Sequence, residues 1–370
     1  MNKVSFVDYI QEYNHIGKET LKAIEKALSK GDLILREDVE TFEKDFAKYI
    51  GTKYSIGVNS CTDALVIALR ACGIKQGDEV ITVSHTFWAT IEAIVHCGAT
   101  PVLMDVGNDY LMKAHELEEF ITEKTKAIIP VHFNGRVCDM DMVMKIAKKH
   151  NLYVIEDAAQ AIGATFRGNM AGSFGDAGCF SFYPSKILGA YGDGGIITTN
   201  NPYIKRQAWL LRAHGQGIKT KDYPILGYGW SSRLQNIQAA ALNVKMKYLG
   251  GWIKRRKEIA GIYDEGLKNT VKIPPQSSEY NNDSYQNYVI RAEKRDGLFE
   301  HLKENGIETL IKDPVPNHLQ PAFTERYGIK KLSLSEQLCE EVISLPMHPY
   351  LTDEEVNYVI IKIREFYEKS

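Results

Sequence analysis

The sequence has no long hydrophobic run, no strong charge of one sign and no paired cysteines. Its formal net charge of −2 gives no electrostatic reason to expect nucleic acid or an anionic membrane as a partner. No apolar stretch reaches the roughly 18 residues of a membrane span, and the opening MNKVSFVDYIQEYN contains no apolar signal segment. We therefore expect a cytoplasmic protein.

The cysteines do not suggest a metal site. The sequence contains no CxxC pair and no histidine spacing typical of zinc ligands. Several cysteines lie inside apolar runs, which favours buried free thiols in a reducing compartment over disulfides. The six are Cys61, Cys72, Cys97, Cys138, Cys179 and Cys339.

Short apolar runs alternate with amphipathic stretches between residues 54 and 200. Helical patterns of twelve residues separate the early runs, and this arrangement predicts βαβ crossovers and a mainly parallel sheet covered on both faces. Ligands of such sheets bind outside the carboxyl ends of the strands. The predicted strands cover residues 54–58, 79–84, 101–106, 127–133, 152–157, 179–183 and 194–199, and the predicted helices 62–73, 87–98 and 140–151.

The chain is longer than one hydrophobic core usually serves, so we expect a large domain and a smaller one. Residues 1–50 show the spacing of amphipathic helices that pack on the rest. A long helical stretch over residues 235–269 leads to a polar loop at 274–286 and a small α/β remainder. We place the large domain at residues 1–245 and the small C-terminal domain at 246–370.

The segment CFSFYPSKILGAYGDGGIITTN, residues 179–200, holds a single lysine, Lys186, among aromatic, glycine and hydroxyl residues. A lysine in a dry pocket loses its proton easily and becomes a nucleophilic amine suited to Schiff-base chemistry. The alternative is an ordinary surface lysine in a loop.

Two other strand ends carry complementary groups. Asn59 to Thr62 lie between a strand and a helix start, where free N–H groups and hydroxyls favour a phosphate, although an ordinary helix cap looks similar. The strand at 152–157 ends in Glu156 and Asp157, and a carboxylate at that edge is suited to a cationic partner such as a pyridinium nitrogen. The alternative for Asp157 is a helix cap.

Together these groups match the needs of pyridoxal phosphate. This cofactor requires an anion site, a carboxylate that keeps its ring nitrogen protonated, and a lysine for its aldehyde. Phe87, in HTFWAT at the end of another strand, offers an aromatic ring to stack on the cofactor. The joint occurrence of these groups in this order predicts a pyridoxal-phosphate enzyme.

Over nearly its whole length the sequence resembles the sugar aminotransferases of the DegT/DnrJ/EryC1/StrS family. The resemblance rests on DALVIALRACGIKQGDEVI, SHTFWAT, EDAAQAIGA, FSFYPSKILGAYGDGG, RLQNIQAAAL and SLPMHPYL. It implies the aspartate-aminotransferase (type I) fold, an α/β fold with a mostly parallel sheet in the large domain. Some members of the wider family carry histidine at the lysine position and are dehydratases, and Lys186 argues against that activity here.

The resemblance also implies a role for each candidate residue. Lys186 is the expected Schiff-base lysine and Asp157 the partner of the ring nitrogen. Gln160 is expected near the phenolic oxygen of the cofactor, and Phe87 on its ring face. The phosphate is expected at Ser60, Cys61, Thr62 and Ser181.

Some family positions differ in this chain. In GWSSRL, Ser231 stands where members commonly have an asparagine supplied across a dimer interface to the phosphate. Asn134 in HFNG replaces a tyrosine, and Asp313 and Asn317 replace a tyrosine and a leucine, while His318 matches. The expected sugar pocket contains Phe6, Asn134, Tyr183, Asp313 and His318.

The implied reaction transfers an amino group from L-glutamate to a nucleotide-linked keto sugar. The N-terminal segment and SLPMHPYL resemble members that aminate C3 of a dTDP-linked 3-keto-6-deoxyhexose. The alternatives are a C4 aminotransferase on a UDP- or GDP-linked 4-keto sugar, and a non-catalytic regulatory relative.

The resemblance further implies a homodimer with active sites built from both chains. Ser231 and Arg233 are then expected near the phosphate in the partner's site. The apolar helix face in QAAALNVKM supports this expectation, because a monomer would have to cover it in another way.

Overall fold

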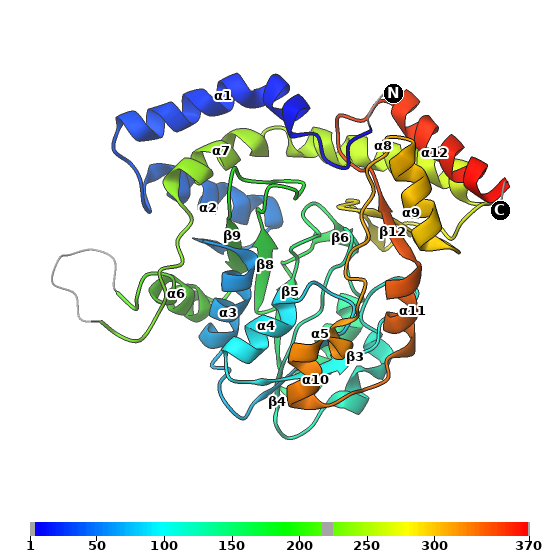
Figure 1. Ribbon diagram of the computed structural model, residues 1–370. Coiled ribbons are helices and arrows are strands. Elements are labelled where there is room, and N and C mark those ends of the chain that lie inside the picture. The colour runs from blue at the N-terminus through cyan, green and yellow to red at the C-terminus, as the bar shows by residue number, and fades with distance from the viewer. Residues whose placement is uncertain (1–3, 217–224, 369–370) are drawn as a thin grey trace.

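The computed structural model describes residues 4–216 and 225–368, and its centre is a seven-stranded sheet (Figure 1). The strand order is β1-β9-β8-β5-β4-β2-β3. All seven predicted strands are present, and the largest difference is at β4, which ends at residue 128 instead of 133. The strands are β1 Tyr54–Val58, β2 Glu79–Val83, β3 Thr100–Met104, β4 Thr125–Ile128, β5 Tyr153–Asp157, β8 Ala177–Ser181 and β9 Gly195–Thr199.

The sheet is mainly parallel, as predicted, except at one strand. Parallel pairing joins β3, β2, β4, β5 and β8, whereas β9 runs antiparallel to both β8 and β1. The segment between β8 and β9 contains no helix that could return the chain to the other end of the sheet, so the chain reverses directly. This reversal places the Lys186 segment at the carboxyl end of β8.

Helices cover both faces of the sheet. Neighbouring strand residues belong to different cores: Val154 packs on one side and Ile155 on the other. One core also receives α2 Glu37–Ile50, α5 Met140–His150 and α7 Asn236–Met246, and the other receives α3 Cys61–Ala71, α4 Ala89–His96 and α6 Pro202–Leu211. The short helix η1 Ala114–Phe120 adds Ala114 and Leu117 to the first of these cores. A separate three-stranded sheet is formed by β6 Thr165–Phe166, β7 Asn169–Met170 and β10 Asn281–Asn282.

The long helical stretch expected after residue 235 consists of two helices, α7 and α8 Leu249–Leu267. The break precedes Gly250 and Gly251, two residues of low helix propensity. The apolar face of α7 packs on α1 Tyr9–Ser29 and α2 of the same chain, so Ala239, Ala240 and Leu242 are buried without a partner. The single chain covers this helix face itself, so the face gives no support to the dimer that we expected from it.

The C-terminal elements form a further core at one end of the molecule (Figure 1). Its sheet pairs β11 Tyr288–Arg291 with β12 Val342–Leu345, and Val4 joins it through a bridge to Ile307. The predicted division at residues 245/246 falls in the last turn of α7, just before the break between α7 and α8, and stays a prediction. Helices α8, α9 Arg295–Glu304 and α12 Asp353–Glu368 contribute to this core. By contrast, Leu338 of α11 Ser333–Glu341 belongs to the first core of the large sheet, and Phe323 of α10 Pro321–Tyr327 clusters with Ile91 and Leu103. The short helix η2 Asn317–Leu319 precedes α10.

All six cysteines are free and buried, which confirms the prediction made from their apolar surroundings. Within the described ranges, no helix combines the length and the apolar character that crossing a bilayer requires.

Candidate active site

A cavity of about 550 Å³ lies at the carboxyl ends of β1, β5 and β8. It is the position at which parallel α/β sheets bind ligands. Most of the residues singled out in the sequence line this one cavity, although they are up to 253 positions apart in the chain (60 to 313). They are Ser60, Cys61, Thr62, Phe87, Asp157, Gln160, Ser181, Tyr183, Lys186 and Asp313.

Backbone hydrogen bonds fix the segment around Lys186, and the side chain of Lys186 lines the cavity. Its N–H donates to Tyr183 O at 2.8 Å, and Gln286 bonds both neighbours, accepting from Ile187 N at 3.0 Å and donating to Ser185 O at 3.1 Å. Among the described residues, none accepts a hydrogen bond from Lys186 Nζ. Burial lowers the pKa of Lys186, against the opposing field of nearby carboxylates, and this favours the neutral nucleophilic amine.

Asp157 ends β5 as a buried carboxylate with a fixed orientation. Its Oδ2 accepts from Thr90 Oγ1 at 2.7 Å, and its Oδ1 accepts from Ala159 N at 3.1 Å. Burial raises the pKa of Asp157, while these two hydrogen bonds and the charge of Lys186 act in the other direction. A cation in the cavity would stabilise the ionised form further.

The start of α3 forms an anion site beside these groups. Ser60 caps the helix by accepting from Asp63 N at 3.1 Å, and the N–H groups of Cys61 and Thr62 lie in the first turn, where the helix has no acceptor for them. Gly195 of β9 packs directly against this turn. A Cβ at that position would lie 2.4 Å from the carbonyl of Ser60, so the close approach requires glycine.

Gln160 presents a donor to the cavity. Its Oε1 accepts from Asn134 N and from Asn287 Nδ2, both at 3.1 Å, so its amide nitrogen is on the other side. Asn134 has a φ of 56°, and its side-chain oxygen accepts from Asn287 Nδ2 at 3.0 Å. Asn134 therefore helps to fix the orientation of the Gln160 side chain and does not itself line the cavity.

The structure does not bring three of the expected sugar-pocket residues into the cavity: Asn134, Phe6 and His318. Phe6 N donates to Glu308 Oε2 at 3.0 Å. His318 is buried, with its ring nitrogens 2.7 Å from Ser84 Oγ and 3.1 Å from Glu336 Oε1, so it ties segment 317–319 to the end of β2.

Ser231 and Arg233 also lie outside the lining of this cavity. The guanidinium of Arg233 donates to Ser231 Oγ at 2.7 Å, and both residues are at least partly exposed. Their predicted place in a partner's active site stays a prediction.

Sequence reasoning missed four residues around the cavity: Thr90, His132, Asn287 and Lys312. Thr90 stands in the SHTFWAT motif, and Lys312 directly precedes Asp313. Their closeness in sequence to these candidate residues could have pointed to both. Asn287 gave no signal, because its role depends on contacts with Gln160 and Lys312 that are distant in the chain.

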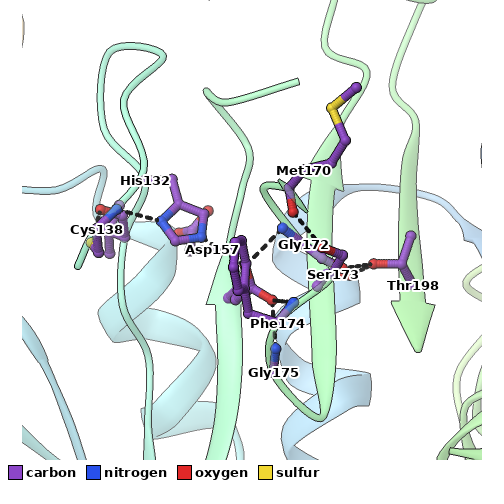
Figure 2. Close-up of polar contacts among 12 residues, drawn as sticks. His132, Cys138, Asp157, Met170, Gly172, Ser173, Phe174, Gly175 and Thr198 are labelled. Atoms are coloured by element: carbon purple, nitrogen blue, oxygen red, sulfur yellow. Dashed lines mark hydrogen bonds and ion pairs between the residues drawn. The ribbon is translucent and has the colours of Figure 1, made fainter. Parts of the chain in front are cut away.

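Glu156 supports the site from the opposite side of β5. Its carboxylate accepts from three backbone N–H groups, those of Gly172, Phe174 and Gly175, at 2.7–2.8 Å (Figure 2). It also lies 2.8 Å from Nε2 of His132. Because Cys138 N donates to the other ring nitrogen at 3.2 Å, the proton of His132 is on Nε2 and points at Glu156. His132 is thereby fixed as a neutral ring in the wall of the cavity.

We expect Glu156→Gln to lower the free energy of unfolding by about 3 kcal/mol, because the site offers only donors and one amide NH₂ must face them. Urea unfolding of the variant measures this change. The matched control is Glu25→Gln on the exposed face of α1, which should change it by less than about 0.5 kcal/mol. Equal effects of the two substitutions would contradict a buried anchoring role for Glu156.

The sequence profile described as the DegT/DnrJ/EryC1/StrS aminotransferase family matches residues 14–364. The chain belongs to this family. It is 41% identical over 369 residues to a "Pleiotropic regulatory protein" of Geobacillus stearothermophilus, covering 98% of both chains. It is 42% identical over 364 residues to a dTDP-3-amino-3,6-dideoxy-alpha-D-galactopyranose transaminase of Aneurinibacillus thermoaerophilus, covering 98% of this chain and 99% of the relative.

A third relative is named as a UDP-N-acetyl-3-dehydro-alpha-D-glucosamine 3-aminotransferase of Acidithiobacillus ferrooxidans, 40% identical, with 98% of this chain and 97% of the relative covered. Among solved structures, DesV of S. venezuelae is similar with a TM-score of 0.95 and 37% identity over the full length of both chains. The type I aminotransferase fold expected from the resemblance is thereby confirmed.

The protein is a pyridoxal 5′-phosphate-dependent aminotransferase, and its cavity fits the cofactor. The part of the chain that the structure describes leaves three groups available to a ligand: the amine of Lys186, the N–H groups at the start of α3, and the remaining lone pairs of the Asp157 carboxylate. These are the three partners that the cofactor needs. Lys186, Asp157, Gln160 and the start of α3 are the residues that would hold it. When bound, the cofactor supplies an electron sink for charge that develops at the substrate carbon.

Proposed function

We propose that this aminotransferase moves the amino group of L-glutamate to C3 of a dTDP-linked 3-keto-6-deoxyhexose, in the biosynthesis of an amino sugar for a surface glycan. The observation that carries the proposal is the convergence of Lys186, Asp157 and the start of α3 on one cavity. The position of amination is supported by the relatives from Aneurinibacillus and Acidithiobacillus, whose names both place nitrogen at C3.

In this function Lys186 is the residue that moves protons. Its amine has no hydrogen-bond acceptor among the described residues, and burial lowers its pKa, which favours the neutral form. In the first half-reaction it takes the proton from the α-carbon of the donor, and in the second it delivers a proton to the sugar carbon. The carboxylate of Asp157, which Thr90 and Ala159 hold in position, would stabilise the positive charge of the cofactor's ring nitrogen. His132 closes the wall as a neutral ring.

A UDP-linked sugar is the second candidate substrate, favoured by the name of the relative from Acidithiobacillus. The C4 reaction on a UDP- or GDP-linked 4-keto sugar remains the alternative for the position. The name of the Geobacillus relative favours a purely regulatory role. A regulatory protein would not need the complete set of cofactor-binding groups that lines this cavity, and this set favours the enzyme.

A panel of dTDP-, UDP- and GDP-linked 3-keto and 4-keto sugars with glutamate tests the proposal, with products read by mass spectrometry and NMR. We expect nitrogen at C3 of the dTDP-linked sugar. Nitrogen at C4, or no turnover with any dTDP-linked 3-keto sugar, would contradict it. Absorbance above about 400 nm that glutamate bleaches separates the enzyme from a regulatory protein.

We also propose a homodimer in which the partner completes the outer wall of the cavity. Phe87 and Tyr183 line the cavity and yet are 62% and 55% exposed in the single chain. Tyr9, Tyr13 and Tyr191, around the start of α1, add to the exposed aromatic surface. Large exposed aromatic side chains at one site are typical of an interface.

Sedimentation at assay concentration is expected to give a species of twice the 41.8 kDa chain mass. Tyr13→Glu should shift the enzyme toward monomer and lower turnover, because a charge enters the proposed contact. Tyr203→Glu, an exposed tyrosine on α6, is the control. A fully active monomer would refute the shared active site.

A further inference from the structure

The cavity contains a second lysine, Lys312, for which the proposed function has no role. Its Nζ donates to Asn287 Oδ1 at 3.1 Å. Asn287 donates through its amide to Gln160 and Asn134, so its oxygen is fixed on the side of Lys312. One rigid polar chain therefore runs from Gln160 to Lys312 and sets the position of both at the cavity wall.

Lys312 has donors to spare. An ammonium group has three, and among the described residues Asn287 is its one hydrogen-bond acceptor. Within the same part of the chain, no carboxylate lies at ion-pair distance from Lys312, although Asp313 is its neighbour in sequence. A partly buried ammonium with unused donors is suited to an acceptor that arrives with a ligand.

Lys312 is also the cation best placed for a ligand. The described residues that line the cavity include two amines, Lys186 and Lys312, and no guanidinium. Lys186 is committed to the cofactor, and the ring of His132 is fixed as a neutral donor to Glu156. An anionic group on a bound substrate therefore meets Lys312 as its partner within this chain.

We propose that Lys312 binds a carboxylate of the substrate in the cavity and thereby selects acidic substrates. This inference rests on the proposed function, in which the carboxylate is that of the glutamate donor. The same chemistry would serve a carboxylate on the sugar, as in a uronic acid. Lys312 is a specificity residue in either case, because it contacts the substrate and not the reacting atoms.

The charges around Lys312 give the expected pH dependence. Burial and the positive charge of Lys186 lower the pKa of Lys312 to about 7, and Asp313 acts in the opposite direction. Asn287, which also packs against it, is neutral. A carboxylate binds the protonated form, so its affinity is full below pH 7 and falls as the pH rises through this value.

The test measures binding apart from turnover. Glutarate, which has the two carboxylates of glutamate and no amine, is titrated into the holoenzyme by calorimetry from pH 6 to 9. For Lys312→Met we expect the dissociation constant at pH 6 to rise about tenfold or more, and the pH dependence to be lost. Lys312→Arg should recover part of the affinity at high pH. Lys331→Met, at an exposed position outside the cavity, is the control.

The two half-reactions identify the source of the carboxylate. If Lys312→Met loses the glutamate half-reaction while absorbance shows that the cofactor is still bound, the carboxylate is that of the glutamate donor. If the variant loses turnover only with a uronic acid sugar and keeps it with neutral sugars, the carboxylate is that of the sugar. Wild-type behaviour of Lys312→Met with glutarate, glutamate and uronic acid would overturn the inference. If glutamate fails to react with the wild-type enzyme, the donor in the proposed function is wrong, and the sugar arm alone decides on Lys312.

Discussion

Lys186→Ala should lose transamination by several orders of magnitude, because nucleophile and proton carrier are removed together. The cofactor should still bind without a covalent bond. Asp157, Gln160 and the first turn of α3 do not depend on the lysine side chain for their positions. The variant therefore separates binding of the cofactor from chemistry.

Turnover and cofactor content of Lys186→Ala are measured side by side, the latter by absorbance after dialysis. Lys254→Ala, at an exposed position of α8, serves as the control and should keep wild-type values. Retention of more than about a tenth of the wild-type turnover would exclude Lys186 from the role assigned here.

Asp157→Asn should reduce turnover by roughly two orders of magnitude or more, the size of one lost electrostatic contribution in a buried site. A neutral amide does not hold the ring nitrogen of the cofactor protonated. Burial disfavours the ionised form of Asp157, so the amide should cost the cofactor-free protein little stability. Thr90 can keep a hydrogen bond to it, because a hydroxyl both donates and accepts.

Steady-state rates and thermal melting of cofactor-free Asp157→Asn check both expectations. Asp45→Asn, on the exposed face of α2, is the control for the change of charge. Normal turnover together with a large drop in melting temperature would mean that Asp157 is a structural cap.

The strands of the sheet could be predicted because their apolar runs are short and helices of recognisable spacing separate them. The antiparallel direction of β9 could not be predicted, since direction depends on whether a helix bridges two strands, and the glycine-rich segment at 189–195 gives no helical period. The break between α7 and α8 was missed for a similar reason. Two glycines weaken a helix without always ending it.

Part of the candidate site could likewise be predicted from the sequence, and part could not. Lys186, Asp157 and the start of α3 could be found from sequence, because each stands at the end of a recognisable strand. The residues that hold these groups in position could not be found in this way. Gln286 lies about 100 residues from Ile187, and Asn287 lies more than 100 residues from Gln160, so only the fold brings these supports to the site. His318 was expected in the cavity and instead bonds Ser84 and Glu336, a choice that depends on the path of segment 317–319.

The most direct test of the account is the location of the bond between protein and cofactor. Holoenzyme is reduced with borohydride and digested, and its peptides are mapped by mass spectrometry. The account predicts the mass of the cofactor on Lys186, although the cavity also offers the amine of Lys312. A label on Lys312 or on any other lysine, or no label in a protein that turns over, would contradict it.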